Sequence, residues 1–391
     1  MHRYPLNTTR LKKLLSDLIR INSVNPSLAI NRQGESGIAR YVGNYLKDLG
    51  VSVNYQTLKT NRVNVIAKIP GQGGGPSLLL NGHTDTVGVD RMAIDPFEPK
   101  FENGKMYGRG SLDMKSGIAA QIMAVETLLE SGITLKGDLI LTFVCDEEYA
   151  SIGTEETLKT LRVDAAIICE PTHLELMIAH KGFAWARIEV FGRAAHGSLP
   201  EEGIDAIVKA GRLLTRLETL SRRKLSTKQH PLLGSPSLHA SLIQGGTELS
   251  TYPDYCKIEL ERRTLPGEDR STVERELQKL IHAAGKNDPC FHADLDVFFY
   301  RPAYEISRDQ PIVRSMSRAV RETGKCPLKY SGMGGWIESA LLAGAGIPTV
   351  IFGPSGEGLH AAVEYVDFDS VVTTAEILIR TLCDYCGVVG Q

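Results

Sequence analysis

The chain has 391 residues, of which 42% are apolar and 23% charged, with 44 Lys and Arg against 46 Asp and Glu. This is roughly two to three times a usual domain length with ordinary globular composition, which excludes a small binding module and a fibrous or disordered protein. A net charge of −2 gives the protein no overall positive potential that would attract polyanions, so no nucleic-acid partner is expected. Apolar runs are too short for a membrane span and residues 1–20 are amphipathic, so we expect a cytoplasmic protein without membrane contact. The odd number of scattered cysteines indicates reduced thiols.

The first part of the chain alternates between helix and strand patterns. Apolar residues at helical spacing predict helices over 11–19 and 38–49. Runs typical of strands follow at 63–69, 77–80, 138–144 and 165–169, with a helical stretch near 117–129. This order predicts an α/β fold with a mixed, largely parallel sheet and helices on both faces.

A different order of elements begins after Ala179. The patterns predict a strand at 184–191, a helix at 204–220, strands at 237–244 and 255–263, a helix at 271–284 and a strand at 291–299. Such a βαββαβ series is typical of a ferredoxin-like α+β domain. Helix and strand alternate again from 312 to 385. The sequence therefore predicts a discontinuous catalytic domain, 1–180 and 300–391, with an inserted domain over 181–299.

Polar residues follow several of the predicted strands. Ligands of open α/β sheets bind at the carboxyl ends of the strands, so these residues are candidates for a site. The segments are 81–85 (NGHTD), 145–148 (CDEE), 170–172 (EPT) and 353–360 (GPSGEGLH), together with Asp113 in a glycine-rich loop at 108–117. We expect their imidazoles and carboxylates to meet at one edge of the sheet.

Together, these side chains favour a shared metal site over separate structural roles for the individual residues. Two histidines and several carboxylates suit zinc or a similar divalent ion, and a bridging carboxylate suggests two ions. His83 and Asp85 alternate along an extended segment, so the carboxylate of Asp85 can orient the imidazole. Adjacent Glu147 and Glu148 repel each other unless a cation or a proton intervenes. Singly, each residue is more often a loop, a cap or a solvated helix start; jointly they indicate a dinuclear hydrolase site.

These segments resemble those of a known family. Residues 80–87 (LNGHTDTV) and 108–117 (GRGSLDMKSG), the Glu147–Glu148 pair, 170–172 (EPT) and late His360 look like the dinuclear-zinc amidohydrolases and metallopeptidases that include acetylornithine deacetylase, succinyl-diaminopimelate desuccinylase, aminoacylase and glutamate carboxypeptidase. The resemblance spans nearly the whole chain and implies two Zn²⁺ per chain, with Co²⁺ or Mn²⁺ as substitutes. It implies these site residues: His83 and Glu170 on one ion, Glu148 and His360 on the other, Asp113 bridging them, Asp85 orienting His83, and Glu147 as general base. It also implies a cis peptide bond after Asp113.

The inserted domain resembles the lid and dimerisation domain of the same family. Residues 192–198 (GRAAHGS) resemble a segment whose histidine stabilises the oxyanion in the partner subunit of a homodimer, which maps to His196. Residues 261–267 (ERRTLPG) resemble a stretch whose arginine binds the substrate carboxylate, which maps to Arg263. Where relatives often have Asn-Val-Val-Pro-Asp, this chain has 250–254 (STYPD), so that Ser250 replaces an asparagine that contacts substrate, or the contact is lost.

The resemblance implies metal-dependent hydrolysis of the amide bond of an N-acyl amino acid, with the two zinc ions activating water and Glu147 moving its proton. An alternative in the same family is a dipeptidase or a glutamate-carboxypeptidase-like exopeptidase acting on a dipeptide. An alternative from another class is a non-catalytic relative that binds metal or ligand, against which the intact ligand set argues. A nucleotide-binding oxidoreductase is disfavoured because no Gly-x-Gly-x-x-Gly follows the early strands, and Asp113 would repel phosphate.

Overall fold

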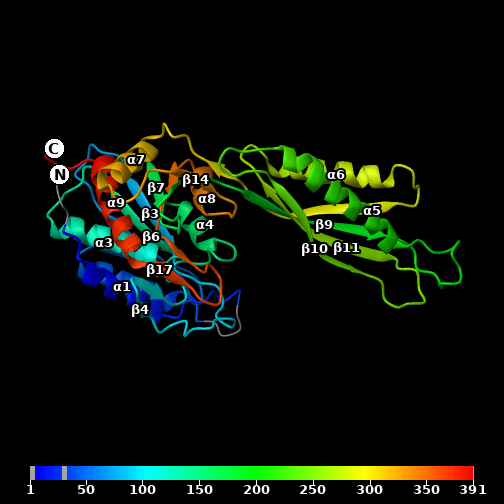
Figure 1. Ribbon diagram of the computed structural model, residues 1–391, viewed down its shortest axis with the longest axis horizontal. Helices are drawn as coiled ribbons and strands as arrows, with labels where there is room; N and C mark the ends of the chain where they lie inside the picture. Colours follow the sequence, from blue (N-terminus) through cyan, green and yellow to red (C-terminus); the bar gives the residue numbers. More distant parts are fainter. Residues whose placement is uncertain (1–4, 29–32, 391) are drawn as a thin grey trace. The chain divides into compact units, whose positions relative to one another are not determined.

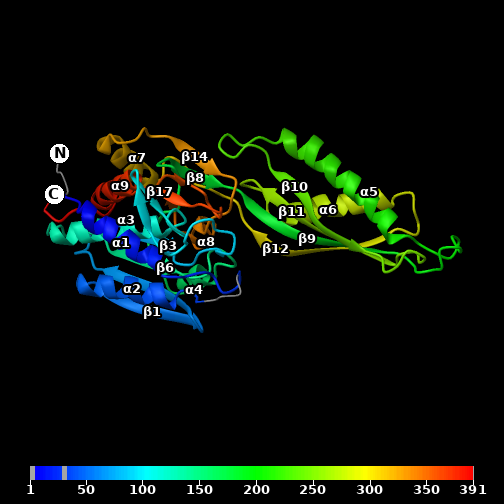
Figure 2. The same cartoon turned by 60° about the horizontal axis from the view of Figure 1, so that its bottom comes forward.

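The computed structural model describes residues 5–28 and 33–390. The chain divides into two compact units (Figures 1 and 2). The larger unit comprises Met1–Ile178, Ile306–Ser331 and Leu341–Gln391, and the smaller unit comprises Ala179–Glu305 and Gly332–Ala340. The smaller unit therefore differs from the expected 181–299 insertion by including a second, later segment, which no local pattern marks.

Short-range signals in the sequence explain several helix boundaries. The helices of the described residues are α1 Thr8–Arg20, α2 Ser36–Asp48, α3 Lys115–Glu130, α4 Ile152–Leu158, α5 Ala206–Thr219, α6 Arg270–Gly285, α7 Pro311–Thr323, α8 Ser339–Gly344 and α9 Phe368–Cys386, with a π-helical turn at Leu220–Lys224 and a 3-10 turn at Leu225–Thr227. The side chains of Asn7, Asp205 and Asp269 accept backbone N–H groups at the starts of α1, α5 and α6. Within residues 5–28 and 33–390, no helix combines the length and the apolar character that crossing a membrane requires.

The main sheet has the strand order β1-β2-β6-β3-β7-β15-β8-β13, with β14 paired to β8. Its strands are β1 Ser52–Lys59, β2 Arg62–Ile69, β3 Leu78–His83, β6 Leu139–Val144, β7 Ala165–Ile168, β8 Leu176–His180, β13 Tyr304–Glu305, β14 Tyr330–Met333 and β15 Thr349–Ile351. The central strands β6, β3, β7 and β15 are parallel to one another. The pairs β1–β2, β2–β6, β15–β8 and β8–β13 are antiparallel. Every residue of β3, β6 and β7 is buried, which is typical of a sheet covered on both faces. The mixed α/β fold class is confirmed.

The parallel centre of this sheet determines where the candidate residues lie. Because β3, β6 and β7 run in the same direction, their carboxyl ends share one edge. His83 is the last residue of β3, so this strand is longer than the predicted 77–80 run. Strand β2 runs antiparallel to β6, which brings its first residue, Arg62, to the same edge.

A small sheet joins distant segments of the larger unit. Its order is β16-β17-β5-β4, with strands β4 Lys100–Glu102, β5 Lys105–Tyr107, β16 Gly356–Glu357 and β17 Tyr365–Asp367. Strand β17 pairs with both β16 and β5. His360 lies in the loop between β16 and β17, and Asp113 lies in the loop after β5. The small sheet therefore connects the two loops that carry these residues.

The smaller unit has the βαββαβ order that the sequence predicts. Its antiparallel sheet has the order β10-β11-β9-β12, with strands β9 Gly182–Phe191, β10 Ser237–Gly245, β11 Tyr255–Thr264 and β12 His292–Arg301. Alternate residues of β9, including Ala184 and Ile188, are buried in one core with Leu213 of α5 and Leu277 of α6. Both helices therefore cover one face of this sheet, as Figure 1 shows.

Candidate metal centre

Two groups of potential metal ligands converge at the carboxyl edge of the main sheet. One group is His83, Asp113 and Glu170, and the other is Asp113, Glu148 and His360; within each group the ligand atoms lie within 4.8 Å of one another. Asp113 belongs to both groups: its Oδ1 lies 3.1 Å from Nε2 of His83, and its Oδ2 lies 3.1 Å from Nε2 of His360. Glu170 Oε1 lies 3.5 Å from His83 Nε2, and Glu148 Oε2 lies 3.2 Å from His360 Nε2. The structure thus brings together the five residues predicted as ligands.

A buried carboxylate, Glu364, holds the loop that presents Asp113. It accepts the backbone N–H groups of Gly110, Leu112 and Asp113 at 3.0, 2.9 and 3.1 Å. The guanidinium of Arg109 donates to the same carboxylate at 2.8 Å, and both side chains are buried. Because Glu364 lies in the β16–β17 loop, one side chain connects the two loops that carry ligands.

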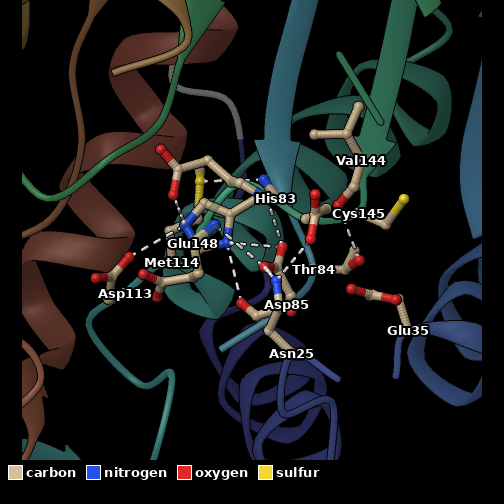
Figure 3. Close-up of polar contacts among 12 residues, drawn as sticks. Asn25, Glu35, His83, Thr84, Asp85, Asp113, Met114, Val144, Cys145 and Glu148 are labelled. Atoms are coloured by element: carbon tan, nitrogen blue, oxygen red, sulfur yellow. Dashed lines mark hydrogen bonds and ion pairs between the residues drawn. The ribbon is translucent and has the colours of Figure 1, made fainter. Parts of the chain in front are cut away.

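The contacts of His83 differ in one respect from the prediction. Its Nδ1 lies 3.0 Å from the backbone carbonyl oxygen of Asp85, but 3.7 Å from the nearer carboxylate oxygen of that residue. A proton on Nδ1 would be donated to the carbonyl group, which leaves Nε2 as the nitrogen that can bind metal (Figure 3). The carboxylate of Asp85 instead accepts the backbone N–H groups of Glu147 and Glu148, both at 3.1 Å.

Glu147 and Glu148 lie in the turn between β6 and α4. Glu147 Oε2 lies 3.9 Å from Nε2 of His83, so the carboxyl group of Glu147 adjoins the ligand cluster. The side chain of Glu148 is only 6% exposed. Its Oε1 is buried and has no hydrogen-bond partner among the residues that the structure describes.

The clustered charges shift the pKa values of several groups. Burial opposes the charged form of His83, but Glu170, Asp113 and Glu147 raise its pKa well above the ordinary value. Burial would raise the pKa of Asp113, yet hydrogen bonds from His360 and His83 hold it well below its usual range. Burial, and then the charge of Asp113, raises the pKa of Glu148 to about 7. Hydrogen bonds to Asp113 and Glu148 raise the pKa of His360 to about 10.

These features fit divalent metal ions. Imidazole nitrogens and carboxylate oxygens are the ligands that zinc and similar ions take in proteins. A buried carboxylate oxygen without a hydrogen bond, such as Oε1 of Glu148, is costly unless a cation or a proton compensates it. The donor chemistry and the unpaired oxygen together support divalent metal binding at this edge.

His196 and Ser250 lie close together in the smaller unit. The N–H of Gly197 donates to the carbonyl oxygen of Ser250 at 2.7 Å. Nδ1 of the exposed His196 lies 2.8 Å from Oγ of Ser198, which restrains the ring. The structure therefore brings the two predicted residues into adjoining segments.

Arg263 lies on β11 of the smaller unit. Its Nε donates to Oε1 of Glu261 at 2.6 Å, and its guanidinium carbon lies 5.1 Å from the centre of the Phe183 ring. A carboxylate that binds this guanidinium through Nε would therefore compete with an existing ion pair.

Four residues that support the larger unit's site were not singled out in the sequence: Asn25, Arg62, Arg109 and Glu364. Arg109 lies within the glycine-rich segment, and its position near Asp113 was the available signal. The other three lie in segments without a motif. Strand pairing brings Arg62 and Glu364 to the site. Asn25 reaches it through the bridge between Val24 and Thr86.

Comparison with known proteins identifies the family. A family described as Peptidase family M20/M25/M40 matches residues 79–384, well over half of the chain. The chain belongs to this family. It is 28% identical over 384 residues to acetylornithine deacetylase of Buchnera aphidicola subsp. Schizaphis graminum, a match that covers 96% of this chain and 97% of that protein.

Two solved structures share the fold of this M20/M25/M40 family member. Aminopeptidase PepT from Bacillus cereus superposes with a TM-score of 0.82 at 21% identity, covering 97% of this chain and 99% of that one. A dinuclear metal binding peptidase from the M20 family of Bacillus subtilis gives a TM-score of 0.77 at 18% identity, covering 98% and 99%. The suspected family is therefore confirmed, and the protein is a hydrolase, a metal-dependent amidohydrolase or peptidase. The cis peptide bond implied by the resemblance is present between Asp113 and Met114.

Proposed function

We propose that this M20/M25/M40 family member is a deacylase that hydrolyses the amide bond of an N-acyl amino acid. The observation that carries the proposal is the pair of ligand groups sharing Asp113, with the carboxyl group of Glu147 beside them. The similarity to acetylornithine deacetylase over almost the full length of both chains supports the substrate class.

The ligand groups suit a pair of zinc ions. We assign His83 and Glu170 to one ion, Glu148 and His360 to the other, and Asp113 to both, because the two oxygens of Asp113 face different histidines. When bound, such ions would polarise the scissile carbonyl group and lower the pKa of the attacking water.

Glu147 is the proposed proton carrier. Its carboxyl group lies beside the cluster and belongs to neither ligand group. It would accept the proton of the attacking water and deliver it to the leaving amine nitrogen. A well-placed acid or base of this kind contributes about 10²–10⁴ in rate. The backbone hydrogen bond from Glu147 to Asp85 holds the general base in place.

We assign substrate recognition to the smaller unit on the strength of its sequence resemblance. Arg263 would bind the α-carboxylate of the substrate, because a guanidinium can pair with a carboxylate through two hydrogen bonds.

His196 would stabilise the oxyanion in the partner subunit of a homodimer, and Ser250 would stand where relatives have asparagine. The outer strand β10 exposes Leu242 and Ile243, a surface that a second copy could cover. None of the seven cysteines, all of which lie among the described residues, forms a disulfide, which suits the proposed cytoplasmic location.

A substrate panel tests the proposal against the exopeptidase alternative. It would compare N-acetyl and N-succinyl amino acids, their α-carboxamide analogues, and dipeptides, all with zinc-loaded protein. We expect turnover of N-acyl amino acids that have a free carboxylate, weak turnover of the carboxamides, and a smaller difference between the two after Arg263→Ala. Faster cleavage of dipeptides would contradict the deacylase assignment, and equal losses on both substrate types after Arg263→Ala would contradict the role of Arg263.

A further inference from the structure

A buried polar network lies beside the metal centre in the larger unit, and Asn25 is at its middle. The Nδ2 of Asn25 donates to Oδ2 of Asp85 at 2.7 Å and to Oδ1 of Asp146 at 3.1 Å. Its Oδ1 accepts a hydrogen bond from Nη2 of Arg62 at 2.7 Å. All four residues are at most 5% exposed. Figure 3 shows Asn25 next to Asp85, on the side of the cluster where Glu35 also lies.

The orientation of the Asn25 amide is determined by its surroundings. Its oxygen also accepts the N–H of Ser27 at 2.8 Å, so the amide nitrogen must face the two carboxylates. The backbone N–H of Asn25 donates to the carbonyl oxygen of Thr86 at 2.8 Å, which fixes the residue beside the segment after β3. Asn25 therefore acts as a donor between two acids, a role that aspartate cannot perform.

Arg62 holds the other side of the same network. Its Nη1 donates to Asp146 at 2.6 Å and to Glu35 at 2.9 Å. Asp146 has a φ of +71°, and its carbonyl oxygen accepts the N–H groups of Ala150 and Ser151 at 3.1 and 2.6 Å. The turn that begins at Asp146 thus depends on Arg62 and Asn25 for the position of its first side chain.

This network reaches the reactive carboxyl groups through the backbone. Asp85 accepts the N–H groups of both Glu147 and Glu148, and Asn25 donates to the carboxylate that does so. We propose that Asn25 and Arg62 are positioning residues that fix Glu147 and Glu148 through Asp85 and Asp146. The proposal rests on the proposed function, because it takes Glu147 as the general base.

The physical reason is the concentration of buried acids. The Asn25 amide donates to Asp85 and Asp146, and the Arg62 guanidinium donates to Asp146 and Glu35. The loss of either donor deprives buried carboxyl groups of a hydrogen bond, and the loss of the amide leaves the carboxylates of Asp85 and Asp146 to repel each other. The turn would then relax, and a displacement of a catalytic group by about 1 Å can cost about 10²-fold in rate.

Asn25→Asp is the sharpest test because it keeps the size of the side chain, replaces the amide donor with an acceptor and adds a negative charge beside Asp85 and Asp146. We expect kcat to fall about 10- to 100-fold with KM unchanged, in assays at saturating Zn²⁺ in which two bound ions per chain are verified. Hydrogen–deuterium exchange at the amides of Glu147 and Glu148 should become faster, a readout that does not depend on activity. Asn25→Ala is measured in the same way and provides the test if the aspartate variant does not fold.

Tyr45→Phe is the matched control. It removes a 2.6 Å hydrogen bond from Tyr45 to the buried carboxylate of Glu126, which lies on α3 and outside the network. We expect its kcat and its exchange at Glu147 and Glu148 to match those of the unaltered protein.

Two results would overturn the proposal: unchanged kcat and exchange in the Asn25 variants, or losses of activity that only follow losses of bound metal. If the unaltered protein cleaves no amide substrate, the proposed function fails instead. Faster exchange at Glu147 and Glu148 in the Asn25 variants, but not in Tyr45→Phe, would still support the positioning role in that case.

Discussion

Glu147 and Glu148 are neighbours with the same chemistry and different surroundings. Glu148 is buried beside His360, whereas Glu147 adjoins His83 and belongs to neither ligand group. Their backbone N–H groups are held by the same carboxylate, that of Asp85. The different roles we propose for them therefore depend on the direction of each side chain.

Glu147→Gln and Glu148→Gln should separate these roles. Glu147→Gln removes a proton carrier and no ligand, so we expect kcat to fall at least about 10²-fold with the metal content unchanged. Glu148→Gln removes the charge of a ligand and should weaken metal binding. Elemental analysis beside steady-state kinetics would measure both effects, and identical behaviour of the two variants would show that the roles are wrongly assigned.

Glu35 should make the stability of the protein depend on pH. Burial, followed by the negative charge of Asp85, raises the pKa of Glu35 from 4.5 to about 8. Between these values the folded chain binds a proton that the unfolded chain releases, so the contribution to stability is full below about pH 4.5 and is lost as pH rises through about 8. The free energy of unfolding that Glu35 contributes falls by at most about 1.4 kcal/mol per pH unit in this range.

Glu35→Gln should reduce this dependence, because an amide does not titrate. We expect the free energy of unfolding of the variant to fall less steeply than that of the unaltered protein between pH 5 and pH 8. Urea denaturation at several pH values measures it. Parallel curves for the two proteins would contradict the raised pKa.

At the scale of elements, the small sheet and Glu364 unite the two loops that carry Asp113 and His360. Glu364→Gln keeps the shape of the side chain but places an amide nitrogen against N–H donors or the guanidinium of Arg109. Leaving such buried donors unsatisfied costs about 1–3 kcal/mol each, so we expect weaker metal binding in a chelator competition assay. Glu357→Gln removes the same charge from an exposed position on β16 and should leave metal affinity unchanged. Equal affinities of the two variants would count against the role of Glu364.

The sequence predicted those elements whose pattern is local. The long apolar runs of β3 and β6 identified the strands, and the polar residues after them identified His83, Glu147 and Glu148. Strands β16 and β17 have two and three residues, too few for periodicity, and they form by pairing with β5 far away in the sequence. Glu364 was missed for the same reason. The carbonyl group of Asp85, which makes the closer contact with His83, belongs to the backbone and leaves no signal in the sequence.

At the scale of the whole molecule, the proposed role of His196 requires a homodimer. The homodimer proposal places His196 of one chain in the active site of the other. Mixing inactive His196→Ala chains with inactive Glu147→Gln chains should then restore part of the activity, because each mixed dimer has one site with both residues intact. The absence of recovery, with subunit exchange verified by differently tagged chains, would contradict the shared site.

The central claim is that the two ligand groups hold a pair of catalytic metal ions. The most direct test is to measure bound metal per chain by elemental analysis, and activity on N-acyl amino acids before and after chelation. We predict two divalent ions per chain when fully loaded, loss of activity as a chelator removes them, and recovery when Zn²⁺ is returned. Protein without stoichiometric metal whose activity is indifferent to chelators would contradict the claim.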